Sequence, residues 1–251
     1  MSVTLLAIDV GNTRIKCALF VQGQMIEDIA FLKDDADRIL HWFDKSHYNE
    51  TIVSSVADFK AEWKDIISKK GKIYFLNHQL RMPIQLDYKS PETLGRDRIS
   101  ACCGAMHQFP HRNCLVVNAG SCITFDLLDS TGHFKGGNIA PGMQMRWKAM
   151  HEFTAKLPLV SAPDGSTPSI LGQNTEGALQ QGVLFGIKAE IESYFHELSA
   201  KYNELICVLS GGDSNFLAKT IKIKTFVRPF LVLEGLYAIW QWNQGNSLDK
   251  H

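Results

Sequence analysis

The sequence predicts an α/β protein built from two similar halves. Strand-like apolar stretches alternate with amphipathic, helix-like stretches along the chain, which is typical of layered α/β folds. The order of the first elements begins again near residue 113, where an apolar strand, a polar turn and a second alternating strand repeat the opening of the chain. We therefore expect two domains, residues 1–111 and residues 112–251, with a boundary near His111.

Five strands and three helices are expected in the first half. Apolar or alternating runs predict strands over residues 5–8, 15–19, 25–31, 51–56 and 72–76. Helical periodicity predicts helices over residues 36–43, 58–69 and 96–107, and the acidic pair Asp34-Asp35 suits the start of the first. The polar loop over residues 77–95 is longer than a plain connection requires, so we expect it to carry function.

The second half is expected to begin with three strands and to end with a helix. The strands are predicted over residues 115–117, 123–127 and 133–142, and the third ends in a turn rich in glycine and proline. A long helical pattern over residues 175–202 is interrupted by Gly182 and Gly186. The stretch "LICVLSGGD" predicts a buried strand that ends in a glycine turn, and an apolar closing helix is expected over residues 229–242.

Composition and charge exclude several classes of protein. Lys plus Arg and Asp plus Glu both number 26, so the formal net charge is zero and no basic field favours nucleic acid. No apolar run approaches the roughly 20 residues that a membrane-spanning helix needs, and the N-terminus has no leader pattern. The six cysteines show neither C-x-x-C nor Cys/His metal spacing, which is typical of reduced thiols. We therefore expect a cytoplasmic protein with no membrane and no nucleic-acid partner.

Two polar turns stand at equivalent places in the two halves. "DVGNT" at residues 9–13 and "NAGS" at residues 118–121 each join the first two strands of a half. Glycines there allow backbone N–H groups to approach a ligand, hydroxyl and amide groups donate hydrogen bonds, and the Asp9 carboxylate suits a magnesium ion. The duplication predicts a nucleotide cleft between the halves. An ordinary hairpin chosen for its backbone conformation is the alternative for "DVGNT" taken alone.

An ordered set of motifs resembles that of the type III pantothenate kinases. The motifs are "DVGNT", "GRDR" at residues 95–98, "NAGSCITFD" at residues 118–126, "GGNIAPG" at residues 136–142 and "QNTEGALQQGVLFG" at residues 173–186. The resemblance implies duplicated ribonuclease-H-like domains of the actin-like ATPase type, with mixed sheets flanked by helices. It also implies a homodimer that phosphorylates pantothenate with ATP and Mg²⁺ to 4'-phosphopantothenate, the first step of coenzyme A biosynthesis.

The resemblance also implies roles for individual residues. Asp97 takes the place of the catalytic base, Asp9 that of the magnesium carboxylate and Ser121 that of a hydroxyl that contacts ATP. The segment that binds the ATP phosphates is Asp9, Val10, Gly11, Asn12, Thr13, Arg14, Ile15 and Lys16. The residues matched to pantothenate binding are Tyr88, Gly95, Arg96, Asp97, Arg98 and, from the neighbouring subunit, Thr175.

Each of the substrate residues also has a purely structural interpretation. "GRDR" suits a helix start, with Asp97 favourable in the first turn and paired to Arg98 on the surface. Tyr88 could cover apolar surface from the loop, and Thr175 could cap a helix.

Asn118 departs from the family pattern, which usually has aspartate there as a ligand of a potassium or ammonium ion. An amide oxygen can coordinate such a cation but lacks the carboxylate charge, so the sequence leaves potassium dependence open. Two other functions stay as alternatives: a different small-molecule kinase of the same superfamily, and an accessory or regulatory relative without activity. The presence of both Asp9 and Asp97 argues against the second.

Overall fold

The computed structural model describes residues 3–55, 59–77, 80–163 and 170–245. The chain forms two compact units, the first comprising Met1–Pro110 with Phe230–His251 and the second His111–Pro229. The second unit thus begins at His111. The closing helix packs within the first unit, so the units differ there from the expected domains, residues 1–111 and 112–251.

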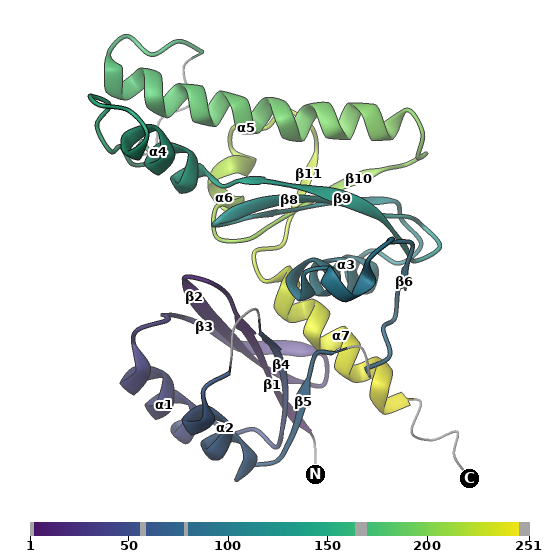
Figure 1. Ribbon diagram of the computed structural model, residues 1–251. Helices are drawn as coiled ribbons and strands as arrows, with labels where there is room; N and C mark the ends of the chain where they lie inside the picture. The colour runs from purple at the N-terminus through teal and green to yellow at the C-terminus, as the bar shows by residue number, and fades with distance from the viewer. Residues whose placement is uncertain (1–2, 56–58, 78–79, 164–169, 246–251) are drawn as a thin grey trace. The chain divides into compact units, whose positions relative to one another are not determined.

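A mixed five-stranded sheet forms the centre of the first unit (Figure 1). Its strands stand in the order β3-β2-β1-β4-β5, in which β1 and β3 are antiparallel to β2, and β1, β4 and β5 run parallel. All five overlap strands that the sequence predicts. Their bounds are β1 (Thr4–Val10), β2 (Arg14–Val21), β3 (Gln24–Leu32), β4 (Glu50–Ser55) and β5 (Lys72–Phe75).

One face of this sheet packs against α1 (Ala36–Lys45) and α2 (Ala61–Ser68). Ile8 and Val10 of β1 belong to one buried cluster with Phe43 of α1 and Trp63 of α2. Successive side chains of a strand point to opposite faces of its sheet. Asp9 therefore lies on the other face, away from this apolar cluster.

The opposite face packs against α7 (Leu231–Gly245), which contacts β1, β2 and β4 and also packs along α3 (Arg96–Gln108). The two helices approach closely at glycines of both: a Cβ atom at Gly235 would overlap the carbonyl oxygen of Ser100, and one at Gly104 would overlap that of Leu231. Leu236 of α7 is fully buried. This apolar, tightly fitted contact is the reason that the closing helix belongs to the first unit.

The sheet of the second unit repeats the topology of the first. Within residues 111–229 the strands run in the order β9-β8-β7-β10-β11, with the same antiparallel and parallel neighbours as β3-β2-β1-β4-β5. The predicted duplication of an α/β unit is confirmed. The bounds are β7 (Cys114–Ala119), β8 (Cys122–Leu128), β9 (His133–Pro141), β10 (Ile206–Ser210) and β11 (Thr225–Val227).

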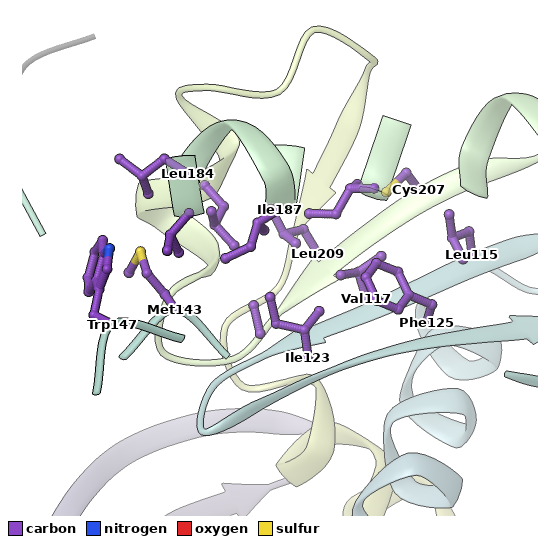
Figure 2. Close-up of a cluster of buried hydrophobic side chains, with 14 of the residues drawn as sticks. Leu115, Val117, Ile123, Phe125, Met143, Trp147, Leu184, Ile187, Cys207 and Leu209 are labelled. Atoms are coloured by element: carbon purple, nitrogen blue, oxygen red, sulfur yellow. The ribbon is translucent and has the colours of Figure 1, made fainter. Parts of the chain in front are cut away.

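Helices α4 (Met143–Glu152) and α5 (Thr175–Ser199) cover one face of this second sheet (Figure 1). Figure 2 shows the core between this sheet and the two helices, in which side chains of β7, β8 and β10 contact side chains of α4 and α5. Leu115, Val117, Ile123, Phe125, Cys207 and Leu209 come from the strands, and Met143, Trp147, Leu184 and Ile187 come from the helices.

Several elements differ from those predicted. Helix α4, strands β6 (Gln85–Leu86) and β11, and a 3₁₀ turn at Pro91–Thr93 are absent from the sequence prediction, and the short helix α6 (Ser214–Ala218) follows Asp213. Helix α5 continues through Gly182 and Gly186, since a long helix tolerates isolated glycines at a modest cost. Residues 56–58 and 78–79, within the predicted strand, helix and polar loop, lie outside the described residues. In the described part of the chain no helix is long and apolar enough to cross a membrane.

Candidate active site

A row of polar side chains crosses the first sheet at the carboxyl end of β1. Lys16 of β2 pairs with Asp9 of β1, and Asp9 pairs with Ser54 of β4. Residues paired in register share one face of a sheet. Asp9 is only 8% exposed and Ser54 is fully buried. The row therefore places a carboxylate, an ammonium group and a hydroxyl side by side where the apolar part of the sheet ends.

The "DVGNT" turn is short and held by backbone hydrogen bonding. The N–H of Gly11 donates to the carbonyl oxygen of Arg14 at 3.0 Å. Val10 and Ile15 have fully buried side chains in the core cluster, so they can offer a ligand only their backbone groups. Asn12, Thr13 and Arg14 are exposed and Gly11 is half-buried. The segment matched to ATP phosphates thus combines accessible polar groups with two anchoring apolar side chains.

Asp97 lies in the first turn of α3, next to the Asp9 row. The pKa of the Asp9 carboxyl is raised to about 7, chiefly by burial; nearby Lys16 opposes this rise and the charge of Asp97 adds to it. Asp97 itself is half-buried. Two carboxylates that are far apart in the sequence therefore interact in one site.

Arg98 and Tyr88 come together beside Asp97. The Arg98 guanidinium carbon lies 5.9 Å from the centre of the Tyr88 ring, within the range of a cation–π contact. Arg98 is only 4% exposed, so the alternative of a surface pair between Arg98 and Asp97 is wrong. Helix α3 turns this arginine inward while its neighbour Arg96 stays exposed.

Arg96 has a different structural role. Its Nη1 donates to the carbonyl oxygen of Ser55 at 3.1 Å. This hydrogen bond ties the start of α3 to the end of β4, the strand that carries Ser54. The contact is with protein backbone, so Arg96 helps to hold the start of α3, and with it Asp97, at the end of the sheet.

In the second unit an equivalent row contains Asn118. Asn118 of β7 pairs with Thr124 of β8 and with Ser210 of β10. Ser210 is fully buried and Thr124 is 5% exposed. Ser121, matched to an ATP contact, is exposed in the turn between β7 and β8. The duplicated topology thus places a polar residue and a buried serine at corresponding positions of both sheets.

Thr175 is exposed at the first position of α5. The N-cap of this helix is Asn174, whose side-chain oxygen accepts a hydrogen bond from the N–H of Gly177 at 2.7 Å. The alternative of Thr175 as the N-cap is therefore wrong, and its hydroxyl is not used for capping.

Sequence reasoning missed Ser54 and Ser210. Ser54 is the next-to-last residue of β4, after "TIV", and Ser210 is the last residue of β10, after "CVL". A polar residue at the carboxyl end of a buried strand was the available signal, but only the strand register shows that each serine lies beside the polar residue of the first strand in its unit.

Comparisons with known proteins agree with the motif set. The family model of type III pantothenate kinases matches residues 5–197. The chain belongs to the type III pantothenate kinase family. A type III pantothenate kinase of Bacteroides fragilis is 38% identical over 244 residues, covering 96% of this chain and 98% of the relative. One of Flavobacterium psychrophilum is 36% identical, covering 96% of this chain and all of the relative.

Solved structures show that the family fold extends to more distant proteins. A protein from Campylobacter jejuni described as a Baf family transcriptional activator has a TM-score of 0.64 at 22% identity, with 96% of this chain and 99% of that chain covered. The activator of 2-hydroxyisocaproyl-CoA dehydratase from Clostridium difficile, solved with bound ADPNP, has a TM-score of 0.56 at 12% identity, with 99% and 98% covered. The predicted fold class, that of actin-like ATPases and sugar kinases, is confirmed.

The buried Asp9 carboxyl makes the stability of the ligand-free protein depend on pH. Its pKa of about 7 lies above the ordinary value of 3.8, so between about pH 4 and 7 the folded state holds a proton that the unfolded state releases. Stability therefore falls as pH rises through this window, and the loss is complete above the folded pKa. Asp9→Asn removes this loss because an amide does not titrate.

We compare the free energy of unfolding of Asp9→Asn with that of the unmodified chain. The difference between the two is expected to shift in favour of the variant by about 2 to 3 kcal/mol from pH 5 to pH 8. Urea denaturation in EDTA, without nucleotide, measures it. A difference that is the same at both pH values would show that the charge of Asp9 is not destabilising.

Proposed function

We propose that this protein transfers the γ-phosphoryl group of ATP to the primary hydroxyl of pantothenate, giving 4'-phosphopantothenate in the first step of coenzyme A biosynthesis. The observation that carries the proposal is the approach of Asp97 to the Asp9 row at the end of the first sheet, in a chain of the type III pantothenate kinase family. Phosphoryl transfer needs mainly positioning and charge stabilisation. A carboxylate for the cation and a second carboxylate for the alcohol supply both.

Asp9 and the segment through Lys16 would bind the magnesium–ATP complex. One carboxylate oxygen of Asp9, Oδ1, is buried with no hydrogen-bond partner among the described residues, which fits a group that a ligand completes. Among the same residues no three His, Cys, Asp or Glu side chains cluster as a metal site. Proteins usually hold magnesium through one or two carboxylates together with substrate phosphates, and Asp9 would be one such carboxylate. Magnesium supplies charge neutralisation at the phosphates, and the Ser121 hydroxyl would add a contact to ATP.

Asp97 would accept the proton of the pantothenate hydroxyl. A carboxylate is a weak base toward an alcohol, so its larger task is to orient the oxygen toward phosphorus, with proton transfer late. Gly95, Arg98 and Tyr88 would surround the substrate, and the buried Arg98 cation would attract its polar end. Arg96 would support these residues from outside the substrate site, because its hydrogen bond to the carbonyl oxygen of Ser55 holds the start of α3 in place.

The homodimer, the monovalent cation and the cytoplasmic location remain parts of the proposal. Large exposed apolar side chains support the dimer: Phe153 after α4 is 85% exposed, and Ile170 and Leu171 before α5 are 73% and 76% exposed. Ile170 and Leu171 shortly precede Thr175, which would reach the substrate of the neighbouring subunit. Asn118 would offer an amide oxygen to potassium or ammonium. Free cysteines, five of them buried, suit a reducing compartment.

One assay tests this function. ATP consumption is measured with pantothenate, glucose or acetate, each in potassium and in sodium buffer. We expect ATP consumption with pantothenate but not with glucose or acetate. The rate should differ little between potassium and sodium buffer, because Asn118 has no charge. Consumption with glucose or acetate but not with pantothenate would favour another kinase of the superfamily, and no consumption at all would favour an accessory protein.

Gly95 keeps space for the Asp97 carboxylate. A Cβ atom at Gly95 would lie 2.7 Å from Asp97 Oδ1, so an added methyl group must displace this carboxylate. The carboxylate is the free end of the Asp97 side chain and can rotate away, so the loss of stability is small. We expect Gly95→Ala to lower kcat for pantothenate by about 10-fold, in line with a misplaced catalytic group, while the urea midpoint changes little. Unchanged kcat would show that Asp97 needs no fixed position.

A further inference from the structure

Ser54 is a buried hydroxyl whose presence the packing does not explain. It is fully buried at the end of β4, and Oγ has no hydrogen-bond partner in the described part of the chain. A buried polar group without a partner lowers the stability of the folded protein. Alanine would fill the position without this cost. The hydroxyl therefore points to a group that is present only when a ligand is bound.

The neighbour of Ser54 indicates which ligand this is. Asp9 stands beside it in register, on the same face of the sheet, and its Oδ1 also lacks a partner among the described residues. Lys16 follows on the other side of Asp9. Two adjacent buried oxygens suit a group that presents several hydrogen-bond donors at once. The water shell of a hydrated magnesium ion is such a group, since each coordinated water donates two hydrogen bonds.

The duplicated unit repeats this feature. Ser210 ends β10, the counterpart of β4, and pairs with Asn118 of β7, the counterpart of β1. Its hydroxyl is likewise fully buried and without a partner among the residues described. In both units, therefore, a buried serine without a described partner stands beside a polar residue of the first strand, which is Asp9 in one unit and Asn118 in the other. Other buried hydroxyls among the described residues, such as those of Ser55 and Ser100, also lack a partner, so the feature that sets Ser54 apart is its place beside Asp9.

We propose that the Ser54 hydroxyl is a further binding residue of this kinase, which accepts a hydrogen bond from the water shell of the magnesium ion that accompanies the nucleotide, next to the carboxylate of Asp9. The proposal rests on the proposed function, because that function brings magnesium and ATP to this row. In this arrangement Asp9 provides the charge and Ser54 provides a neutral acceptor, which together orient the hydrated ion against the phosphates.

Calorimetric titration with ADP tests the proposal without using catalysis. ADP is titrated into the full chain with magnesium and, separately, with EDTA. Ser54→Ala is expected to weaken ADP binding about 5-fold with magnesium, the equivalent of one hydrogen bond, and to leave binding in EDTA unchanged. The urea midpoint of the ligand-free variant is expected to equal or exceed that of the unmodified chain, because the unpaired hydroxyl is gone.

Thr51→Val is the matched control. Thr51 lies on the same strand, is 1% exposed and faces the opposite side of the sheet, since strand residues an odd number apart face opposite ways. This variant should bind magnesium–ADP within 2-fold of the unmodified chain. Magnesium–ADP affinity of Ser54→Ala equal to that of the unmodified chain would overturn the proposal, and so would an equal loss with and without magnesium.

Failure of the inference and failure of the proposed function give different results. If the unmodified chain phosphorylates pantothenate and Ser54→Ala keeps full magnesium–ADP affinity, only the role of Ser54 is wrong. If the unmodified chain binds no magnesium–ADP, the proposed function and the inference are both wrong.

Discussion

Asp97→Asn is expected to lower kcat for pantothenate phosphorylation by about 10²-fold or more, because general base catalysis contributes about 10² to 10⁴. Asparagine keeps the size of the side chain but cannot accept the proton of the alcohol. ATP binding should stay close to that of the unmodified chain or improve slightly, since the Asp97 charge that opposes ionisation of Asp9 is removed. Steady-state kinetics and ADP titration calorimetry measure the two effects separately.

Asp37→Asn serves as the matched control for this variant. Asp37 is an exposed acidic residue in the first turn of α1, so its replacement removes a similar favourable charge from a helix N-terminus. We expect full activity from Asp37→Asn. Normal kcat in Asp97→Asn would remove Asp97 from the role of base, whatever its position beside Asp9.

Gly235→Ala is expected to destabilise the protein by about 3 kcal/mol, at the upper end of the range for overpacked sites. A Cβ atom at Gly235 would overlap the carbonyl oxygen of Ser100, and this is backbone that cannot rotate away. The α3 and α7 helices must then separate. Because α3 carries Asp97 in its first turn, the fraction that stays folded should also have reduced kcat. Urea denaturation and kinetics of the folded fraction measure the two effects.

Gly182→Ala is the opposite case in α5. Nothing lies within 4 Å of a Cβ atom at Gly182, which is exposed in the helix interior. Alanine has a higher helix propensity, so this variant should gain up to about 1 kcal/mol of stability. Equal effects of the two glycine substitutions would show that the α3–α7 contact is not as close as described.

Much of the fold could be predicted because it depends on local pattern. The strands of the first sheet and the polar turns follow from alternating apolar residues and from glycine, and the repeated order predicted the duplication. Helix α4 was missed because "MQMRWKAMHE" has no clear apolar stripe, and only Met143 and Trp147 of it are buried. Helix α5 was expected to be interrupted because local propensity penalises glycine, and packing of the long helix outweighs that penalty.

The candidate site could be predicted in its motifs but not in its contacts. The motif set gave Asp9, Asp97 and Arg98 as functional residues, while burial of Arg98 against Tyr88 and the bond from Arg96 to Ser55 depend on how α3 meets the sheet. Ser54 has no motif of its own.

The sequence by itself determined the strand and helix pattern, the duplication and the family, since these depend on the order of residue types along the chain. Only the tertiary structure decided that the closing helix packs on α3 in the first unit, that Asp97 lies near Asp9, and that Ser54 stands beside Asp9 with no partner for its hydroxyl among the residues described. These three facts are contacts between residues that are distant in sequence. They arise from strand register and helix packing, which no local pattern encodes.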